Sequence, residues 1–345
     1  MYTHDELKGS IQKEITSIYF GGGTPSLFSP DNAARIIDKI MSTSTSNSDL
    51  EITLEVNPKT VDIEKLKAFY AIGVNRLSIG VQSFQDRFLR NLGRVYGSDD
   101  AINLIEDARS SGFSNIGLDL IFGVPDQTLG LWKMDLEYTL FLRPEHISVY
   151  NLTIEENTPF YDLQKKGRIT LPDELVQVRM FRLAQDMFVK AGYEHYEISN
   201  FSLPGFRCRH NEGYWILEEY MGFGAGAHSY LREGSSHGDW GIRWKNINDP
   251  YEYISRLSSS CSAVVEREEL TREEAIKETI FLGLRRLEGI DLDDFRKRFG
   301  LSLKKVFSNI IPYLLEENLI LIDEERLKLT TKGILLSNEV FLRFF

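Results

Sequence analysis

This sequence has little cysteine, no long apolar run and no excess of basic charge. Its 345 residues include 2 cysteines, Cys208 and Cys261, which are far apart and form no CxxC pair. This excludes a disulfide framework or an all-cysteine metal site within one chain. No apolar stretch approaches the roughly 20 residues that cross a bilayer, so we expect no integral membrane segment. The net charge of -11 argues against general nucleic-acid binding, because phosphate contacts need clustered basic residues.

The N-terminal sequence MYTHDELKGSIQKE has neither a signal-peptide core nor the arginine-rich, acid-poor character of an organelle-targeting segment. We therefore expect a cytoplasmic protein. The composition, 42% hydrophobic and 26% charged, is that of an ordinary globular protein. The length is compatible with one large α/β domain and a smaller second domain.

Short β-branched runs alternate with longer segments of helical period in the first two thirds of the chain. The predicted strands are 15–20, 51–56, 76–81, 116–122, 146–152 and 195–201, and the predicted helices are 30–41, 63–72, 99–111, 129–141 and 173–191. Such alternation, with near-continuous apolar strands, favours βαβ units and a parallel sheet. Six units are compatible with either an open doubly wound sheet or an incomplete (β/α) barrel.

The pattern changes toward the C-terminus. We expect the α/β domain to occupy residues 1–232 and an irregular connecting segment to occupy residues 233–269. From residue 270, short charged helices precede a strand-turn-strand, which predicts a small helical, winged-helix-like domain over residues 270–345. Because this domain carries many acidic residues, an interaction or packing role is favoured over DNA binding.

Polar residues gather where the predicted strands end, which is where parallel α/β folds carry their functional side chains. The first strand opens into Gly21-Gly22-Gly23-Thr24-Pro25, and the later strands or their loops carry Glu55, Gln82, Arg94 and Asp119. Considered one at a time, these residues are also typical of an ordinary turn, a helix cap or a solvent-exposed loop. As a set they suit a small zwitterion that bears a ribose, with Arg94 clamping a carboxylate. A phosphate cradle is the rival interpretation, although the glycines lack the following Lys-Ser/Thr and the G-x-G-x-x-G spacing.

Five motifs in order, YFGGGTPS, EVNP, RLSIGVQSF, LGRVYG and GLDLIFGVPDQT, resemble the radical S-adenosylmethionine enzymes of the oxygen-independent coproporphyrinogen III oxidase group, and among these the haem-chaperone (HemW) subgroup. The resemblance implies an incomplete (β/α) barrel of radical-SAM type with a HemN-type C-terminal domain. It places the methionyl amino group of S-adenosylmethionine on Gly22, Gly23 and Thr24. It further implies that Glu55 and Arg94 bind the amino-acid end and that Gln82 and Asp119 bind the ribose. Tyr96 stands where the family usually has a histidine.

A second cluster lies in FRCRHNEGYWILEEYMGFGAGAHSY. In isolation it suits a buried turn with aromatic packing, or a haem site in which imidazole or thiolate ligates iron and aromatic rings cover the macrocycle. HemW-like proteins have an H-N-x-x-Y-W motif implicated in haem binding, and it maps here onto His210, Asn211, Tyr214 and Trp215. We expect His210 to be an axial ligand, with Cys208 as the second choice.

The family normally begins with a strand and a CxxxCxxC loop that holds a [4Fe-4S] cluster, and that motif does not occur in these residues. We therefore expect the first βα unit of the barrel to be largely absent and the edge of the sheet to be exposed. A [4Fe-4S] cluster is expected only if an upstream cysteine segment exists.

Three functions follow from these patterns. The first is a haem chaperone that binds haem and S-adenosylmethionine and hands haem, or a related porphyrin, to respiratory proteins. The second is oxygen-independent coproporphyrinogen III oxidase activity, which needs the cluster. The third is a non-redox scaffold that binds S-adenosylmethionine. Whether the chain forms a homodimer is left open.

Overall fold

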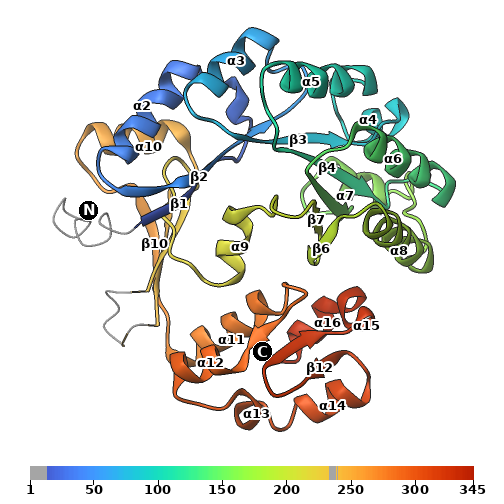
Figure 1. The fold of residues 1–345 in the computed structure, drawn as a ribbon, viewed down its shortest axis with the longest axis vertical. Coiled ribbons are helices and arrows are strands. Elements are labelled where there is room, and N and C mark those ends of the chain that lie inside the picture. The colour runs from blue at the N-terminus through green and yellow to red at the C-terminus, as the bar shows by residue number, and fades with distance from the viewer. Residues whose placement is uncertain (1–13, 233–237, 239) are drawn as a thin grey trace. The chain divides into compact units, whose positions relative to one another are not determined.

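The computed structural model describes residues 14–232, 238 and 240–345 (Figure 1). The chain divides into two compact units, one ending at His210 and the other beginning at Asn211. The N-terminal residues 1–13, on which the expected location partly rests, lie outside the described range. In the described part of the chain, no helix combines the length and apolar character needed to cross a membrane.

The first unit contains a seven-stranded curled sheet in the order β1-β2-β3-β4-β5-β7-β6. Its strands are β1 (Glu14–Phe20), β2 (Thr45–Val56), β3 (Arg76–Gln82), β4 (Ile116–Phe122), β5 (His146–Asn151), β6 (Glu194–Glu197) and β7 (Asn200–Ser202). The first five strands are parallel, as predicted, and β7 and β6 complete the sheet in antiparallel pairing. The predicted incomplete barrel is thus confirmed.

The prediction of one strand over residues 195–201 is wrong, because this segment is a tight hairpin. Its turn is closed by Glu197, whose Oε1 accepts a hydrogen bond from the backbone N–H of Ser199 at 3.1 Å. The chain reverses here, so β6 and β7 run antiparallel where a sixth parallel strand was expected.

Helices cover the outer face of the sheet (Figure 1). The helices of this unit are α2 (Pro30–Met41), α3 (Ile63–Ala71), α4 (Asp86–Asn91), α5 (Ser98–Ser110), α6 (Leu129–Leu142), α7 (Pro159–Lys165), which has no buried residue, and α8 (Glu174–Lys190), with a 3-10 turn, η1 (Pro25–Leu27). Side-chain caps define where several begin: Ser29 accepts from the N–H of Asn32, and Asp62 accepts from that of Lys65. Such caps satisfy N–H groups that have no partner within the helix.

Strand residues alternate between the two faces of the sheet. On the outer face they are apolar and buried under the helices: Ile52, Leu54, Leu77, Ile79, Leu118, Leu120, Ile147 and Val149. The other positions form what we call the inner face, and they are mostly polar: Ser17, Tyr19, Glu51, Thr53, Glu55, Arg76, Ser78, Asp119, His146 and Ser148. The expectation of near-continuous apolar strands is therefore wrong. The sheet has one apolar face and one polar face, and the polar face carries the candidate site.

The second unit begins with a three-stranded antiparallel sheet in the order β10-β9-β8. Its elements are β8 (His228–Leu231), β9 (Ile242–Asn246), α10 (Pro250–Ser258) and β10 (Val264–Glu269). The expected irregular segment 233–269 is therefore regular over much of its length, while residues 233–237 and 239 lie outside the described range. Helix α9 (Arg209–Trp215) carries residues of both units.

The C-terminal part has the order helix, strand, helices, hairpin. It comprises α11 (Arg272–Gly283), β11 (Ile290–Asp291), α12 (Leu292–Phe299), α13 (Leu303–Val306), α14 (Ile311–Glu316), β12 (Ile320–Ile322), β13 (Arg326–Leu329), α15 (Thr331–Leu335) and α16 (Ser337–Leu342). The strands pair in the order β11-β13-β12, which is the winged-helix-like arrangement that the sequence predicted.

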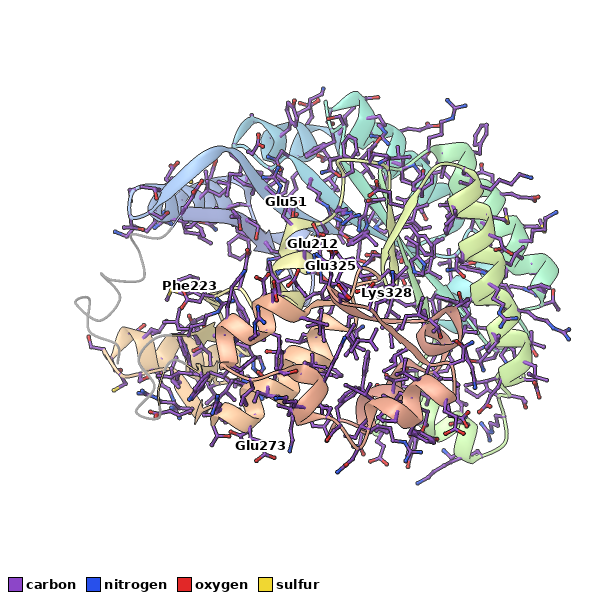
Figure 2. All side chains as sticks on the ribbon, turned by 60° about the horizontal axis from the view of Figure 1, so that its bottom comes forward. Glu51, Glu212, Phe223, Glu273, Glu325 and Lys328 are labelled. Carbon is purple, nitrogen blue, oxygen red and sulfur yellow. The ribbon has the colours of Figure 1, made fainter. Side chains whose placement is uncertain are left out.

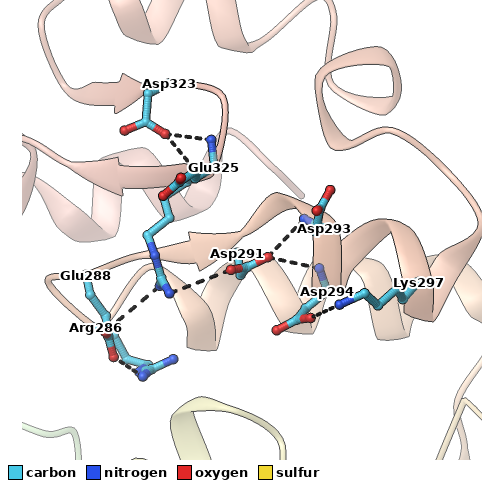
Figure 3. A network of polar contacts seen from close by, with 9 residues as sticks. Arg286, Glu288, Asp291, Asp293, Asp294, Lys297, Asp323 and Glu325 are labelled. Carbon is cyan, nitrogen blue, oxygen red and sulfur yellow. Dashed lines mark hydrogen bonds and ion pairs between the residues drawn. The ribbon is translucent and has the colours of Figure 1, made fainter.

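A polar network joins the hairpin of this domain to α12 (Figure 3). Asp291 caps the helix, accepting from the N–H groups of Asp293 and Asp294 at 2.9 and 3.0 Å. Its carboxylate also lies 3.6 Å from the guanidinium of Arg326 in β13, whose backbone N–H is held by Asp323. These contacts give the acidic residues of the domain a structural role.

Candidate functional site

A bare backbone loop follows β1 at Gly21, Gly22 and Gly23. Gly22 and Gly23 have φ values of 77° and 67°, and no heavy atom lies within 4 Å of the position that a Cβ atom would take at either residue. Gly21 differs, because a Cβ atom there would come within 2.3 Å of the ring of Tyr19 and 2.9 Å of Glu55 Oε1. The loop therefore offers exposed backbone groups to a ligand, while its first glycine makes room for two side chains of the inner face.

Glu55 is held against this loop. Its Oε1 accepts a hydrogen bond from the Tyr19 hydroxyl at 2.7 Å, and its Oε2 accepts one from the N–H of Gly22 at 3.1 Å. Burial and the neighbouring Glu55 carboxylate raise the pKa of Tyr19, so its hydroxyl stays a donor at neutral pH. Thr24 follows the loop, and its side chain makes no capping bond to η1. The carboxylate and the threonine hydroxyl both lie beside the exposed loop.

Gln82 ends β3 in a conformation that is unusual for a residue other than glycine, with φ of 67°. The backbone directly after it is anchored to α6 through Asp135, which is fully buried. This carboxylate accepts from the Ser83 hydroxyl at 2.8 Å and from the N–H of Phe84 at 2.9 Å. The contacts offset the strain at Gln82 and hold it at the end of the strand.

Asp119 lies in the middle of β4 on the inner face, and Ser148 of β5 is its register partner. The Ser78 hydroxyl donates to it at 3.2 Å. Burial raises the pKa of Asp119 to about 6, although hydrogen bonds from Ser148 and Ser78 oppose the shift. A carboxylate so placed can accept hydrogen bonds from hydroxyl groups of a ligand.

Arg94 lies in the loop after α4, half-buried, and its Nε is a buried donor without a partner among the described residues. Tyr96, where the related family usually has a histidine, is 6% exposed and donates its hydroxyl to the carbonyl of Gly80 at 2.6 Å. Tyr96 therefore supports the end of β3, while Arg94 keeps a donor for an anionic group.

The chemistry of these residues is compatible with the groups of S-adenosylmethionine. A carboxylate such as Glu55 can accept from an ammonium group, a guanidinium such as Arg94 can bind a carboxylate, and Asp119 and Gln82 can hydrogen-bond to hydroxyl groups. All four come from successive strands or strand-end loops of one sheet, as the sequence predicted.

Glu51, labelled in Figure 2, connects β2 to the start of α9 and is 7% exposed. Its two carboxylate oxygens accept from the backbone N–H groups of Arg209 and His210 at 3.2 and 3.3 Å. The Cys208 thiol, fully buried, donates to the same carboxylate at 3.7 Å. These hydrogen bonds connect the first turn of α9, the helix that carries the second sequence cluster, to the inner face of the sheet.

His210 packs on β1. Its imidazole stacks on the ring of Tyr19 with centroids 4.4 Å apart and planes 14° apart, and its Nδ1 lies 3.4 Å from the Ser17 hydroxyl. Burial, and after it the positive charge of Arg76, lower the pKa of His210 to about 4. The side chain is therefore neutral at pH 7, which is the form of imidazole that ligates a metal.

Asn211, Tyr214 and Trp215 continue α9 and belong to the second unit. All three are half-buried. Tyr214 packs edge-on against Tyr220 at 4.6 Å, and burial raises its pKa to about 12. The guanidinium of Arg285 lies 4.6 Å from the ring of Trp215.

Sequence reasoning missed four residues of the inner face: Tyr19, Glu51, Arg76 and His146. Arg76 is 2% exposed and His146 is 1% exposed, and His146 shares a 2.8 Å hydrogen bond with the hydroxyl of Tyr196. The signal that would have found them is the alternation of polar and apolar residues within strands, as in EITLEV and RLSIG.

Comparisons with known proteins agree with this geometry. Residues 5–138 match the Radical SAM superfamily and residues 270–336 match the HemN C-terminal domain. The chain is 39% identical to the haem chaperone HemW of Bacillus subtilis, over 96% of this chain and 86% of the relative. It is 35% identical to the haem chaperone HemW of Lactococcus lactis, over 99% of this chain and 87% of the relative. The chain belongs to the HemW family. The family resemblance predicted from the five motifs is thereby confirmed.

The chain is also 32% identical to the mitochondrial radical S-adenosyl methionine domain-containing protein 1 of Danio rerio, over 98% of this chain and 79% of the relative. Among solved structures, the coproporphyrinogen III oxidase HemN from Escherichia coli, a radical SAM enzyme, is similar with a TM-score of 0.79 and 22% identity. The match covers 99% of this chain and 82% of that one, and it shows a common fold.

HemW-family membership raises the question of an iron–sulfur cluster, which radical SAM chemistry uses. Of the two cysteines, Cys208 is buried against Glu51 and Cys261 is exposed. Among the described residues, no three His, Cys, Asp or Glu side chains come together in a way that would hold a metal ion. The donor set of these residues therefore does not fit a [4Fe-4S] cluster.

Proposed function

We propose that this member of the HemW family binds haem through helix α9 and hands it to acceptor proteins. The observation that carries the proposal is the placement of His210, the first residue of the H-N-x-x-Y-W motif, at the first turn of α9, where its backbone N–H donates to Glu51 at 3.3 Å and its imidazole stacks on Tyr19. Neutral imidazole is a standard axial ligand of haem iron. The names of the Bacillus subtilis and Lactococcus lactis relatives as haem chaperones support the same function.

Within the motif, His210 is the proposed axial ligand, and Asn211, Tyr214 and Trp215 are proposed to contact the macrocycle. Cys208 is less suited to ligate iron, because it is fully buried and its thiol donates to Glu51. We propose respiratory proteins as the haem acceptors and the cytoplasm as the location.

The inner face supports a second ligand, S-adenosylmethionine. We propose that Gly22, Gly23 and Thr24 contact its methionyl ammonium, that Glu55 and Arg94 bind its amino-acid end, and that Gln82 and Asp119 bind its ribose. The partnerless Nε of Arg94 and the open space over the glycine loop favour this assignment. Oxidase chemistry on a coproporphyrinogen needs a cluster, and the two cysteines of these residues do not supply its ligands, so our proposal for these residues is limited to binding.

Titration with ferric haem, followed through the Soret absorbance, tests the chaperone proposal. His210→Ala is expected to weaken haem binding by about tenfold or more, which corresponds to about 1.4 kcal/mol. His228→Ala is the matched control, because His228 is an exposed histidine outside the motif, and its haem affinity should equal that of the wild type. Equal affinity of the His210→Ala variant and the wild type would contradict the proposed ligand, and no Soret shift in the wild type would contradict haem binding altogether.

A further inference from the structure

Tyr19 contacts one residue of each proposed ligand site, Glu55 and His210, both of which lie in the first unit. Its hydroxyl donates to Glu55 Oε1 at 2.7 Å, and Glu55 is the residue proposed to bind the amino-acid end of S-adenosylmethionine. Its ring stacks on the imidazole of His210, the proposed haem ligand, with centroids 4.4 Å apart. One side chain therefore links the two ligand sites through direct contacts.

The local structure keeps Tyr19 in this position. Because strand residues alternate between faces, Ser17 and Tyr19 share the inner face of β1, and both contact His210. Gly21 comes next on the same face. A side chain there would overlap the ring of Tyr19 and the carboxylate of Glu55, since its Cβ atom would lie 2.3 Å from one and 2.9 Å from the other. The contact between Tyr19 and Glu55 thus depends on the first glycine of the loop.

Glu55 is the point at which a ligand can act on this arrangement. In the structure its two oxygens are shared between the Tyr19 hydroxyl and the N–H of Gly22. An ammonium group that binds the same carboxylate restricts its rotamers, and a fixed carboxylate fixes the direction of the Tyr19 hydroxyl. The ring then presents a constant stacking surface to His210, so less conformational freedom is left to lose when iron binds the imidazole.

We propose that Tyr19 is a positioning residue that couples the two sites, so that S-adenosylmethionine bound at Glu55 tightens the binding of haem at His210. The inference rests on the proposed function of both sites. Because such coupling is reciprocal, haem must tighten the binding of S-adenosylmethionine by the same factor.

The test compares haem affinities with and without S-adenosylmethionine in the full chain. Ferric haem is titrated by Soret absorbance in the absence of S-adenosylmethionine and at a saturating concentration, for wild type, Tyr19→Phe and Tyr193→Phe. Tyr19→Phe keeps the ring and removes the bond to Glu55. Tyr193→Phe is the matched control, because this buried tyrosine donates to the carbonyl of Pro144 at 2.5 Å, away from both sets of site residues.

We expect S-adenosylmethionine to tighten haem binding by about fivefold or more in the wild type and in Tyr193→Phe, and by less than about twofold in Tyr19→Phe. Calorimetric titration of S-adenosylmethionine with and without haem should give the same factor in the wild type. A wild-type factor near one would overturn the coupling while leaving haem binding intact. A factor that persists in Tyr19→Phe would show that the coupling does not pass through Tyr19. Failure of the wild type to bind haem in either condition would remove the proposed function and the coupling together.

Discussion

At the residue scale, the neutral state of His210 leads to a prediction about pH. Its pKa in the folded protein is about 4, whereas a histidine in an unfolded chain titrates near 6.5. Between these values the unfolded state binds the proton and the folded state does not, so the free energy of unfolding falls as pH falls from about 6.5 to about 4. We expect the NMR titration of the His210 imidazole to have its midpoint well below 5.5, with the signal assigned by its loss in His210→Gln. A midpoint near 6.5 would show that the imidazole is solvated and would weaken its assignment as a ligand that stays neutral.

Polar residues near strand ends could be predicted from sequence, while most polar residues within strands could not. Glu55, Gln82 and Arg94 stand beside turn signals at one edge of a parallel sheet, so their grouping follows from topology. Asp119, within β4, was predicted because it is a lone carboxylate in an apolar run. Glu51 was missed because it was counted only as the start of an apolar strand. The alternation in EITLEV places Glu51 on the polar face, but it does not identify the partner, His210, which is 159 residues away in sequence.

At the element scale, the link between β3 and α6 leads to a prediction about stability. Burial raises the pKa of Asp135 to about 6, above the 3.8 of an ordinary aspartate. The folded state then holds the proton more tightly, so the free energy of unfolding should fall by about 1 kcal/mol as pH rises from 5 to 8. Asp135→Asn can keep both contacts, with its oxygen accepting from Phe84 and its amide donating to Ser83. We expect it to remove this pH dependence and to stabilise the protein at pH 8, as measured by urea unfolding.

Two further variants make that experiment decisive. Asp135→Ala leaves the hydroxyl of Ser83 and the N–H of Phe84 unpaired, so it should destabilise the protein by about 1–3 kcal/mol. Asp186→Asn, an exposed aspartate of α8, controls for the loss of one negative charge and should change stability little. If Asp135→Asn destabilises the protein as much as Asp135→Ala at pH 8, the carboxylate is a favourable ionised acceptor and the raised pKa is contradicted.

The order of the elements explains which larger features were predictable. The alternation of strands and helices was enough to indicate the barrel, and the sequence of short helices before a hairpin was enough to indicate the winged-helix-like domain. The hairpin of β6 and β7 was not predicted, because His195 to Phe201 reads as one continuous strand. Its turn is closed by side-chain bonds of Glu197 to Ser199 and of His195 to Ile198, which composition does not reveal.

At the scale of the whole molecule, the scarcity of cysteine leads to different predictions for haem binding and for the uptake of an iron–sulfur cluster by these residues. The two cysteines are one buried thiol that donates to Glu51 and one exposed thiol, Cys261. Three thiolate ligands are what the family uses to hold a [4Fe-4S] cluster, and these residues supply neither the number nor the spacing. We therefore expect a protein of these 345 residues to take up far less than one cluster per chain after anaerobic reconstitution, as measured by iron and sulfide analysis.

The same preparation should bind ferric haem whether or not it has been through reconstitution, because the proposed ligand is the imidazole of His210 and not a thiolate. Cys208→Ser and Cys261→Ser serve as controls, since neither should abolish the Soret shift. Near-stoichiometric, redox-active iron and sulfide would contradict the prediction and return radical chemistry to consideration. If haem binds only after reconstitution, the uptake of iron is required for haem binding, and the imidazole of His210 alone is not sufficient.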